Sequence, residues 1–373
     1  MNTIVKSCLL RRTKDQKSTV TGEEIVSLPP KQVQVHTMKL GVEERKVYDE
    51  VFSFSRQAMV NYMKKHEEKK ADHDMIKQVQ DNEYKFRPDF NVEGEAQEMA
   101  NKFSQGSEIK AHHLLVLLLR LRQICDHPGL IKTMLEEETK ASEGLLDNND
   151  DQDLVNQLSG MSLNGVHKKG DSDMELKVLD PGNPIFKEAE ASSKINTVLG
   201  KLKELKKKQE ETGIMEKAVV VSQWTSMLNI IRGHVKQLGF KVAEINGSIA
   251  VKSRGDIVED FNKVGSGAQV MLLSLAAGGV GLNLIGANHL FLLDMHWNPQ
   301  LEAQACDRIY RVGQKREVTI HKFFCEDTVE SRILDLQNKK MDLANSVLTG
   351  AKRTNANRLT LDDLKMLFDL NRK

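Results

Sequence analysis

Five short runs of β-branched and apolar residues recur along the second half of the chain and constrain its fold more than any other feature. They are AVVVS (218–222), KVAEI (241–245), QVMLLSL (269–275), HLFLLD (289–294) and VTIHKFFC (318–325). Segments with helical spacing of apolar residues, such as SMLNIIRGHVKQLG and SRGDIVEDFNKVG, lie between most of them. Strands that are apolar throughout and alternate with helices form parallel sheets covered on both faces. We therefore predict an α/β fold, a doubly wound parallel sheet, over residues 191–350.

Two helical segments are expected in the first third of the chain. Residues 43–70, EERKVYDEVFSFSRQAMVNYMKKHEEKK, have apolar side chains at helical spacing and contain no Pro or Gly. Residues 111–125, AHHLLVLLLRLRQIC, are apolar nearly all round, which requires packing on most sides. We predict a helical protrusion and linker region over 1–132, entered through the extended segment LPPK (28–31).

Residues 133–190 differ in composition from the segments on either side. EEETKASEGLLDNNDDQD is acidic, NGVHKKGDSD is polar, and aromatic residues are almost absent. Such a segment buries too little apolar surface to offset the entropy lost on folding, so we predict an acidic, disordered insertion. Its acidity fits either simple solvation or a basic partner. The tail, 351–373, is predicted to carry a short helix.

Charge and cysteine content exclude several classes of protein. Lys and Arg number 54 and Asp and Glu 53, so any attraction to nucleic acid must come from local patches. Cys8, Cys125, Cys306 and Cys325 form no Cys-x-x-Cys pair, which argues against a zinc ribbon or disulfide scaffold and for a reducing, intracellular compartment. No histidine spacing matches a metal site, so none is predicted. The longest apolar run, LLVLLL, is far shorter than the roughly 20 residues of a membrane span, so no membrane partner is expected.

Polar residues and glycines follow the predicted strands, at the edge of the sheet where α/β proteins bind ligands. Ser222–Thr225 follow the first strand at a helix start, where free amides favour a phosphate. The other segments are Asn246–Ser248 after the second strand, the glycine-rich SLAAGGVGLNL (274–284) after the third, and Asp294 with MHWNP after the fourth. Trp224 and Trp297 fit either the core or a nucleic-acid path at these strand ends.

The segment PQLEAQACDRIYRVGQ (299–314) is predicted to be a helix with one polar face. Gln304, Asp307, Arg308 and Arg311 follow i, i+3, i+4 and i+7 spacing, which puts them on that face. Two interpretations stay open. Guanidinium groups suit phosphate oxygens, whereas Asp307 and Arg311, four residues apart, also suit a plain surface ion pair.

Three blocks, KAVVVSQWTSML, LLSLAAGGVGLNLIGANHLFLLDMHWNP and QACDRIYRVGQKREV, follow one another in the second half of the chain. Together with LLRRTKDQ, LPPK and LRLRQICDHPGLI upstream, they resemble the Swi/Snf-type, helicase-like ATPases over nearly the whole chain except the acidic insertion. Within that family, the stretch from Ser274 to Gln314 and the tail LTLDDLKMLF look like the transcription termination factor two (lodestar) group. Many relatives have Arg and Asp where this chain has Ala276 and Asn288, and that group shares both changes.

The resemblance implies a RecA-like second motor lobe, with ATP and Mg²⁺ bound between it and a first lobe. Arginine fingers from the second lobe would act on the nucleotide, and turnover would step the motor along double-stranded DNA. The residues carried over are Arg308 and Arg311 for the fingers; Gly279, Gly281, Gln304 and Asp307 for the nucleotide and lobe interface; and Gln223, Trp224, Asn246, Ser248 and Ser274 for the DNA phosphates.

The chain contains neither a G-x-x-x-x-G-K-[ST] phosphate loop nor an acidic strand end that would hold magnesium. We therefore expect half of a motor, either a fragment or a lobe that needs a first lobe in the same gene product or in trans, which would hold the metal. The resemblance implies release of RNA polymerase II transcripts and a nuclear location, with a cytoplasmic stage in part of the cell cycle. An inactive DNA- or protein-binding module is the alternative. A Rossmann-type enzyme is disfavoured, because the third glycine, Gly286, falls two positions late.

Overall fold

The computed structural model describes most of the chain, in segments. The described residues are 17, 22–23, 26–81, 111–135, 178–275, 277, 281–296, 298–347 and 359–370, with the backbone alone for 66–81, 111–112 and 340–347. Most of the predicted acidic insertion lies outside them. Internal contacts divide the chain into two compact units: a sheet unit, Met1–His36 with Val198–Phe323, and a helical unit, Thr37–Thr197 with Phe324–Lys373.

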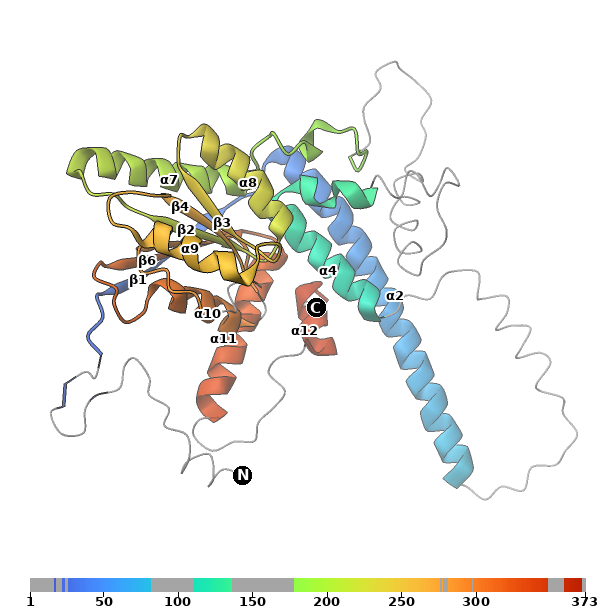
Figure 1. Ribbon diagram of the computed structural model, residues 1–373. Coiled ribbons are helices and arrows are strands. Elements are labelled where there is room, and N and C mark those ends of the chain that lie inside the picture. The colour runs from blue at the N-terminus through green and yellow to red at the C-terminus, as the bar shows by residue number, and fades with distance from the viewer. Residues whose placement is uncertain are drawn as a thin grey trace, which may run out of the picture. The chain divides into compact units, whose positions relative to one another are not determined.

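The sheet unit is built on six strands in the order β1-β6-β5-β2-β4-β3 (Figure 1). Their bounds are β1 Lys31–Met38, β2 Ala218–Ser222, β3 Val242–Ile245, β4 Val270–Ser274, β5 His289–Leu292 and β6 Val318–Cys325. The pairs β2–β4, β2–β5, β3–β4 and β5–β6 are all parallel, and Ala218 lies level with both Val270 and His289. The predicted α/β class and all five predicted strands are confirmed.

Strand β1 is an addition that the sequence pattern did not predict. Its residues follow LPPK, which we expected only as an extended lead into helices. The amide of Val318 donates to the carbonyl of Pro30 at 3.0 Å, and β1 lies at the edge of the sheet, next to β6. Most of its side chains are exposed, so its sequence lacks the buried apolar run from which a strand could be predicted.

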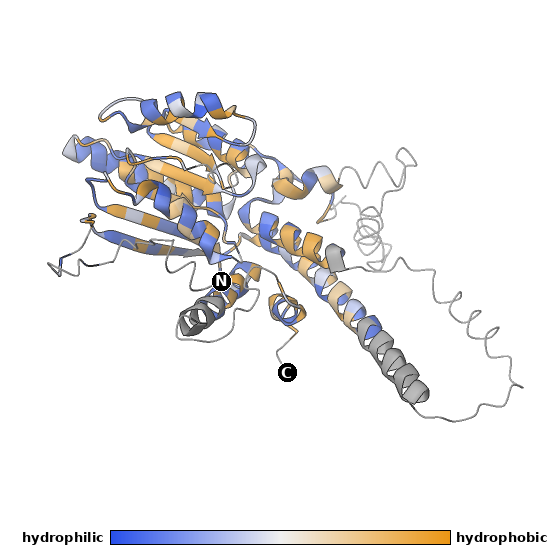
Figure 2. Ribbon diagram, turned by 60° about the horizontal axis from the view of Figure 1, so that its bottom comes forward, coloured by the Kyte–Doolittle hydropathy of each residue, from blue (hydrophilic) through white to orange (hydrophobic). Residues whose placement is uncertain are grey.

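Helices α8 (Thr225–Gln237), α9 (Val251–Asn262) and α10 (Pro299–Ile309) connect the strands and pack on the sheet. The residues of β2, β4 and β5 are buried throughout, as expected for strands covered on both faces. Figure 2 shows these apolar strands in orange between helices with hydrophilic outer surfaces. One core cluster joins them to Phe261 of α9 and to Ala305 and Ile309 of α10. Helix α7 (Ser193–Thr212) precedes β2.

The helical unit contains the two helices predicted in the first third of the chain. They are α2 (Val42–Asp81) and α4 (Ala111–Asp126), which pack on each other, with the turns η1 (Pro128–Ile131) and η2 (Pro184–Phe186) and the helices α11 (Val329–Val347) and α12 (Leu361–Leu367). Leu114, Leu117 and Leu121 of α4 are fully buried, whereas Leu115 is 40% exposed. Among the described helices, none combines the length and the apolar character that crossing a bilayer requires.

Candidate functional site

The carboxyl ends of β2 and β5 are joined by a buried carboxylate. Asp294, 5% exposed, accepts hydrogen bonds from the Ser222 hydroxyl at 2.5 Å, from the Gln223 amide at 3.1 Å and from the Gln223 side-chain nitrogen at 3.0 Å. The Trp224 amide donates to the Ser222 hydroxyl at 3.0 Å. The expectation that these amides are free for a phosphate is therefore wrong for Gln223 and Trp224, because protein oxygens already bind them. Thr225, the first residue of α8, is exposed.

The loop after β3 is folded by its own side chains. Asn246 is buried, and its carbonyl oxygen accepts from the amide and hydroxyl of Ser248 at 2.9 and 2.6 Å, while its nitrogen donates to Glu244 at 2.7 Å. Arg254, in the first turns of α9, is also buried and donates to the carbonyls of Asn246 and Ile249. Of the two residues in this loop that were predicted to bind DNA, Ser248 is exposed and Asn246 is not.

Ser274 ends β4 beside Ser222, which ends β2. Its side chain is buried, and the hydroxyl accepts from the Ala277 amide at 3.2 Å. Ser274 therefore shapes the start of the glycine-rich loop. Gly279, Trp297 and Ala276 lie outside the described residues, while Gly281 is exposed.

Helix α10 begins as its sequence predicts. Asn298 caps it by accepting from the Gln300 amide at 3.1 Å, and Pro299 occupies the first helical position. Glu302, in the first turn, is 4% exposed; it accepts from the His296 amide at 3.1 Å and from the Lys322 ammonium at 2.8 Å. These bonds fix the helix to the segment that leads from β5.

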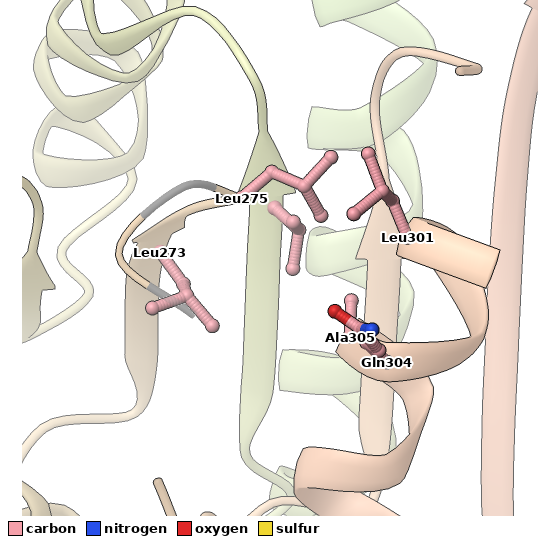
Figure 3. A pocket seen from close by; sticks show the side chains of 6 residues that line it. Leu273, Leu275, Leu301, Gln304 and Ala305 are labelled. Atoms are coloured by element: carbon pink, nitrogen blue, oxygen red, sulfur yellow. The ribbon is translucent and has the colours of Figure 1, made fainter. Parts of the chain in front are cut away.

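A small cavity lies where α10 crosses the ends of β2 and β4. Figure 3 shows Leu273 and Leu275 on one side of it and Leu301 and Ala305 on the other, with Gln304 beside them. Its volume is about 10 Å³, room for about one water. Gln304 is largely exposed, as predicted for a residue on the polar face of the helix.

The four residues predicted to share one helical face do not all lie on the helix. Helix α10 ends at Ile309, and the ψ of Tyr310 is 77°, so Arg311 leaves the helical path. Its guanidinium donates to the carbonyls of Gly281 at 3.2 Å and Leu282 at 3.5 Å. The hydrogen bonds of Arg311 in the described part of the chain are therefore to the glycine-rich loop and not to Asp307.

Arg308 lies on α10, half-buried. Its Nε is buried and has no hydrogen-bond partner, and no carboxylate among the described residues pairs with its guanidinium. Burying part of a cation without a counter-charge is unfavourable unless a ligand completes the site. The Arg308 guanidinium thus has no counter-charge within the described part of the chain, while that of Arg311 is bound to the glycine-rich loop.

Sequence reasoning missed Gln314, which holds the turn after α10. Gln314 is buried, and its side-chain nitrogen donates to the carbonyls of Ala287 at 2.8 Å, Ile309 at 3.2 Å and Ile285 at 3.3 Å. Its oxygen accepts from the two following backbone amides at 3.0 Å. The only signal for it in the sequence is its place directly after a glycine in RVGQ.

Gly286 also has a role that the sequence pattern did not reveal. A Cβ there would lie 2.6 Å from the Cα of Asn262 and 3.0 Å from the carbonyl of Phe261, at the end of α9. The third glycine of the segment therefore serves close packing of the loop on α9. This explains why its spacing departs from the dinucleotide fingerprint.

Two family models match the chain. Residues 198–313 match the helicase conserved C-terminal domain, and residues 1–130 match the SNF2-related domain. With the parallel sheet and the arginines after β5, these matches define a helicase-like motor protein. The chain belongs to the Swi/Snf-type family of helicase-like ATPases, as its motifs predicted.

The chain is similar to curated proteins along nearly all of its length. It is 44% identical to Transcription termination factor 2 of Drosophila melanogaster, over 99% of this chain and 36% of that protein. It is 30% identical to Helicase-like transcription factor of Mus musculus, over 99% of this chain and 38% of that protein. The chain thus spans less than two fifths of these relatives.

One solved structure supports the fold. The crystal structure of the C-terminal part of the Fun30 ATPase domain aligns with a TM-score of 0.51 at 22% identity, covering 92% of this chain and 97% of that one. This likeness is consistent with the RecA-like architecture that the motifs implied.

Proposed function

We propose that this chain is the second lobe of an ATP-dependent double-stranded DNA translocase. The observation that carries the proposal is Arg308, a half-buried guanidinium in the last turn of α10 with no counter-charge among the described residues. Arg311, three residues further along, is bound to the glycine-rich loop. Two cations this close in the chain suit the phosphates of a nucleotide.

In this proposal Arg308 and Arg311 complete a nucleotide site whose other half lies on a first lobe. The nucleotide supplies a γ-phosphoryl group, and Mg²⁺ held by the first lobe neutralises part of its charge. The Arg308 Nε has no partner to leave within the described part of the chain when an anion binds. Arg311 has to exchange its bonds to the Gly281 and Leu282 carbonyls, so binding of the nucleotide and movement of the glycine-rich loop would be linked.

The other proposed contacts divide by exposure. Gln304 and Asp307 are exposed on α10 and are proposed to meet a first lobe, and Gly279 and Gly281 belong to the loop that would couple nucleotide and DNA. Ser248 is exposed, and Gln223 and Trp224 are half-buried, so these three are proposed to meet DNA. The remaining two, Asn246 and Ser274, would act by shaping their loops.

The cellular role proposed is release of RNA polymerase II transcripts in the nucleus. Its support is the similarity to Transcription termination factor 2 along the whole chain. On its own the chain should not hydrolyse ATP, because its sequence holds no phosphate-loop motif.

The test is to join this chain to a first lobe of the family and to measure ATP hydrolysis with and without double-stranded DNA. We expect DNA to stimulate hydrolysis, and Arg308→Ala or Arg311→Ala to lower the rate on the order of 10³-fold. The matched control is Arg232→Ala, which removes an arginine that pairs with Glu244 on the surface of the same lobe and should leave the rate within about twofold. DNA binding without any hydrolysis by the unsubstituted protein would favour the inactive binding module instead.

A further inference from the structure

Asp294 binds the loop after β2 through both of its carboxylate oxygens. Both of its oxygens accept hydrogen bonds from the loop after β2: one from the Ser222 hydroxyl, the other from the side-chain nitrogen of Gln223, with the Gln223 amide at 3.1 and 3.2 Å from the two oxygens. Ser222 and Asp294 are both buried. Bonds to a buried carboxylate are charge-assisted and therefore stronger than neutral ones. The position of Gln223 and of the loop between β2 and α8 thus depends on Asp294.

The same residue begins the segment that leads into α10. Two residues after Asp294, the His296 amide donates to the buried carboxylate of Glu302 in the first turn of that helix. The His296 ring then accepts from the Asn298 amide, and Asn298 caps the helix. The hydrogen bonds at Asp294 and those at His296 are thus separated by only two residues of backbone, which connects Gln223 to the start of the helix that carries Arg308.

The Asp294 carboxylate also limits where a phosphate can bind to the loop after β2. The amide of Gln223 points at Asp294, and a second anion cannot share it without close repulsion between like charges. DNA phosphates must therefore bind further along, at the exposed start of α8 and at Ser248. Asp294 does not touch DNA in this arrangement. It sets the position of the groups that do.

We propose that Asp294 is a positioning residue. It holds the loop after β2 in a fixed position relative to the start of α10, so that DNA bound at the loop favours the active placement of the arginines. This inference rests on the proposed function and deepens it. It assigns to one buried carboxylate the link between DNA occupancy and nucleotide turnover. Loss of that link should change how the rate responds to DNA, and not the rate in the absence of DNA.

The experiment uses the chain joined to a first lobe, with hydrolysis measured over a range of double-stranded DNA concentrations. Asp294→Asn keeps the shape but replaces one acceptor oxygen by a donor, so the side chain can accept from the Ser222 hydroxyl or from the Gln223 side chain but no longer from both, and its negative charge is lost. We expect the DNA concentration for half-maximal stimulation to rise about tenfold, and the rate without DNA to stay within about twofold. A purely structural role would instead lower both rates together.

Two further variants keep the outcome clear. Ser222→Ala keeps the charge of Asp294 and removes the hydroxyl's bond to Asp294 and the bond that it accepts from the Trp224 amide. It should raise the half-stimulating DNA concentration by a smaller factor, which tests the inference even if Asp294→Asn does not fold. Asp256→Asn, an exposed aspartate on α9 in the same lobe, makes the same change of charge and should have no effect.

The results separate the two proposals. If the unsubstituted protein shows no DNA-stimulated hydrolysis, both fail. If it is stimulated but Asp294→Asn and Ser222→Ala respond to DNA as the unsubstituted protein does, or if Asp256→Asn changes the response equally, only the role of Asp294 is overturned.

Discussion

Lys194, at the start of α7, is a fully buried charge in the helical unit. Its side chain is 0% exposed, and its ammonium lies 2.8 Å from Asp126 of α4 and 2.6 Å from Glu330 of α11. Burial alone lowers the pKa of this lysine, but the carboxylates of Asp126 and Glu330 raise it well above its ordinary value. Because the folded-state pKa is raised, the contribution of Lys194 to stability is fully present below pH 10.5 and is lost only at higher pH.

Replacing Lys194 by Met should destabilise the protein by about 3–5 kcal/mol, because two buried carboxylates lose their counter-charge. The measurement is urea unfolding followed by circular dichroism at pH 7. Lys201→Met on the same helix is the matched control; Lys201 pairs with Glu204 at the surface, and its loss should cost about 1 kcal/mol or less. Equal destabilisation by the two variants would contradict the expectation.

Individual residues show where sequence-based prediction ends. Arg308 was predicted as a site residue because of its residue type and its place after a buried strand. The burial of Lys194, Asp294 and Gln314 could not be predicted, since a polar side chain within a helix or loop pattern is expected to be exposed. Their burial depends on partners far away in the sequence, such as Glu330, which lies 136 positions from Lys194. The roles proposed for the site residues stay predictions.

Among the elements, β1 is held to the sheet by a row of histidines. The His36 Nε2 lies 2.9 Å from the Nδ1 of His321 on β6, and the Nε2 of His321 lies 3.1 Å from the Nδ1 of His289 on β5. The Nε2 of His289 faces the Glu216 carboxylate at 3.6 Å. A carboxylate at that end fixes an N–H on His289 Nε2, so each neutral ring donates from Nε2 and accepts at Nδ1.

Stability should therefore fall as the pH drops from 7.5 to 5. Burial and the neighbouring rings of His289 and His36 lower the pKa of His321 to about 3. Its contribution is full above the unfolded pKa of 6.5 and is lost as pH falls toward 3, which amounts to about 2 kcal/mol at pH 5. The nearby His289 ring and the hydrogen bond from the Asn288 side chain lower the pKa of Glu216 to about 2, so that group loses its contribution only below pH 4.5.

The measurement is the urea midpoint at a series of pH values between 5 and 7.5. His321→Phe is the control, because a phenyl ring can stack on Phe291, which lies 4.5 Å from the His321 ring, but cannot titrate. That variant should lose most of the pH dependence. A dependence as steep as that of the unsubstituted protein would show that other groups cause it.

Gly281 and Gly286, both in the connection between β4 and β5, differ in the space available for a side chain. At Gly286 an added methyl group would meet backbone atoms of Asn262 and Phe261 at 2.6 and 3.0 Å, whereas at Gly281 it would meet nothing within 4 Å. Gly286→Ala should destabilise the protein by about 1–3 kcal/mol through overpacking, and Gly281→Ala should change stability by less than about 1 kcal/mol. Thermal unfolding of the two variants provides the comparison, and equal changes in melting temperature would rule out the packing role of Gly286.

The strands that are buried on both faces of the sheet could be predicted from the sequence. The strands β2, β4 and β5 are covered on both faces, so their sequences are apolar throughout and were recognised. Strand β1 was missed because Val33 and Val35 are more than half exposed and its partner β6 lies far along the chain. The position of Arg311 was also mispredicted. The spacing of apolar residues predicts a helix that continues through Arg311, whereas the backbone at Tyr310 leaves the helical conformation and ends α10.

At the scale of the whole molecule, the near-zero net charge of +1 limits how the chain can bind DNA. Attraction must come from a few cations near the proposed DNA residues and not from the field of the protein. Lys252 is exposed in the first turn of α9, directly after the loop that carries Ser248. It is at the carboxyl end of β3, whereas the exposed Lys241 is at the amino end of the same strand.

The salt dependence of DNA binding by this chain should accordingly be shallow. With about two to four phosphate contacts, the logarithm of the binding constant should fall with the logarithm of salt concentration at a slope of roughly −2 to −4. Lys252→Gln should reduce the magnitude of that slope by about 1, and Lys241→Gln should leave it unchanged. Fluorescence anisotropy with labelled duplex DNA at several salt concentrations measures both. A slope steeper than about −6 would mean that DNA lies on another surface of the chain, because binding at two to four phosphate contacts cannot release that many counterions. Equal effects of the two substitutions would lead to the same conclusion.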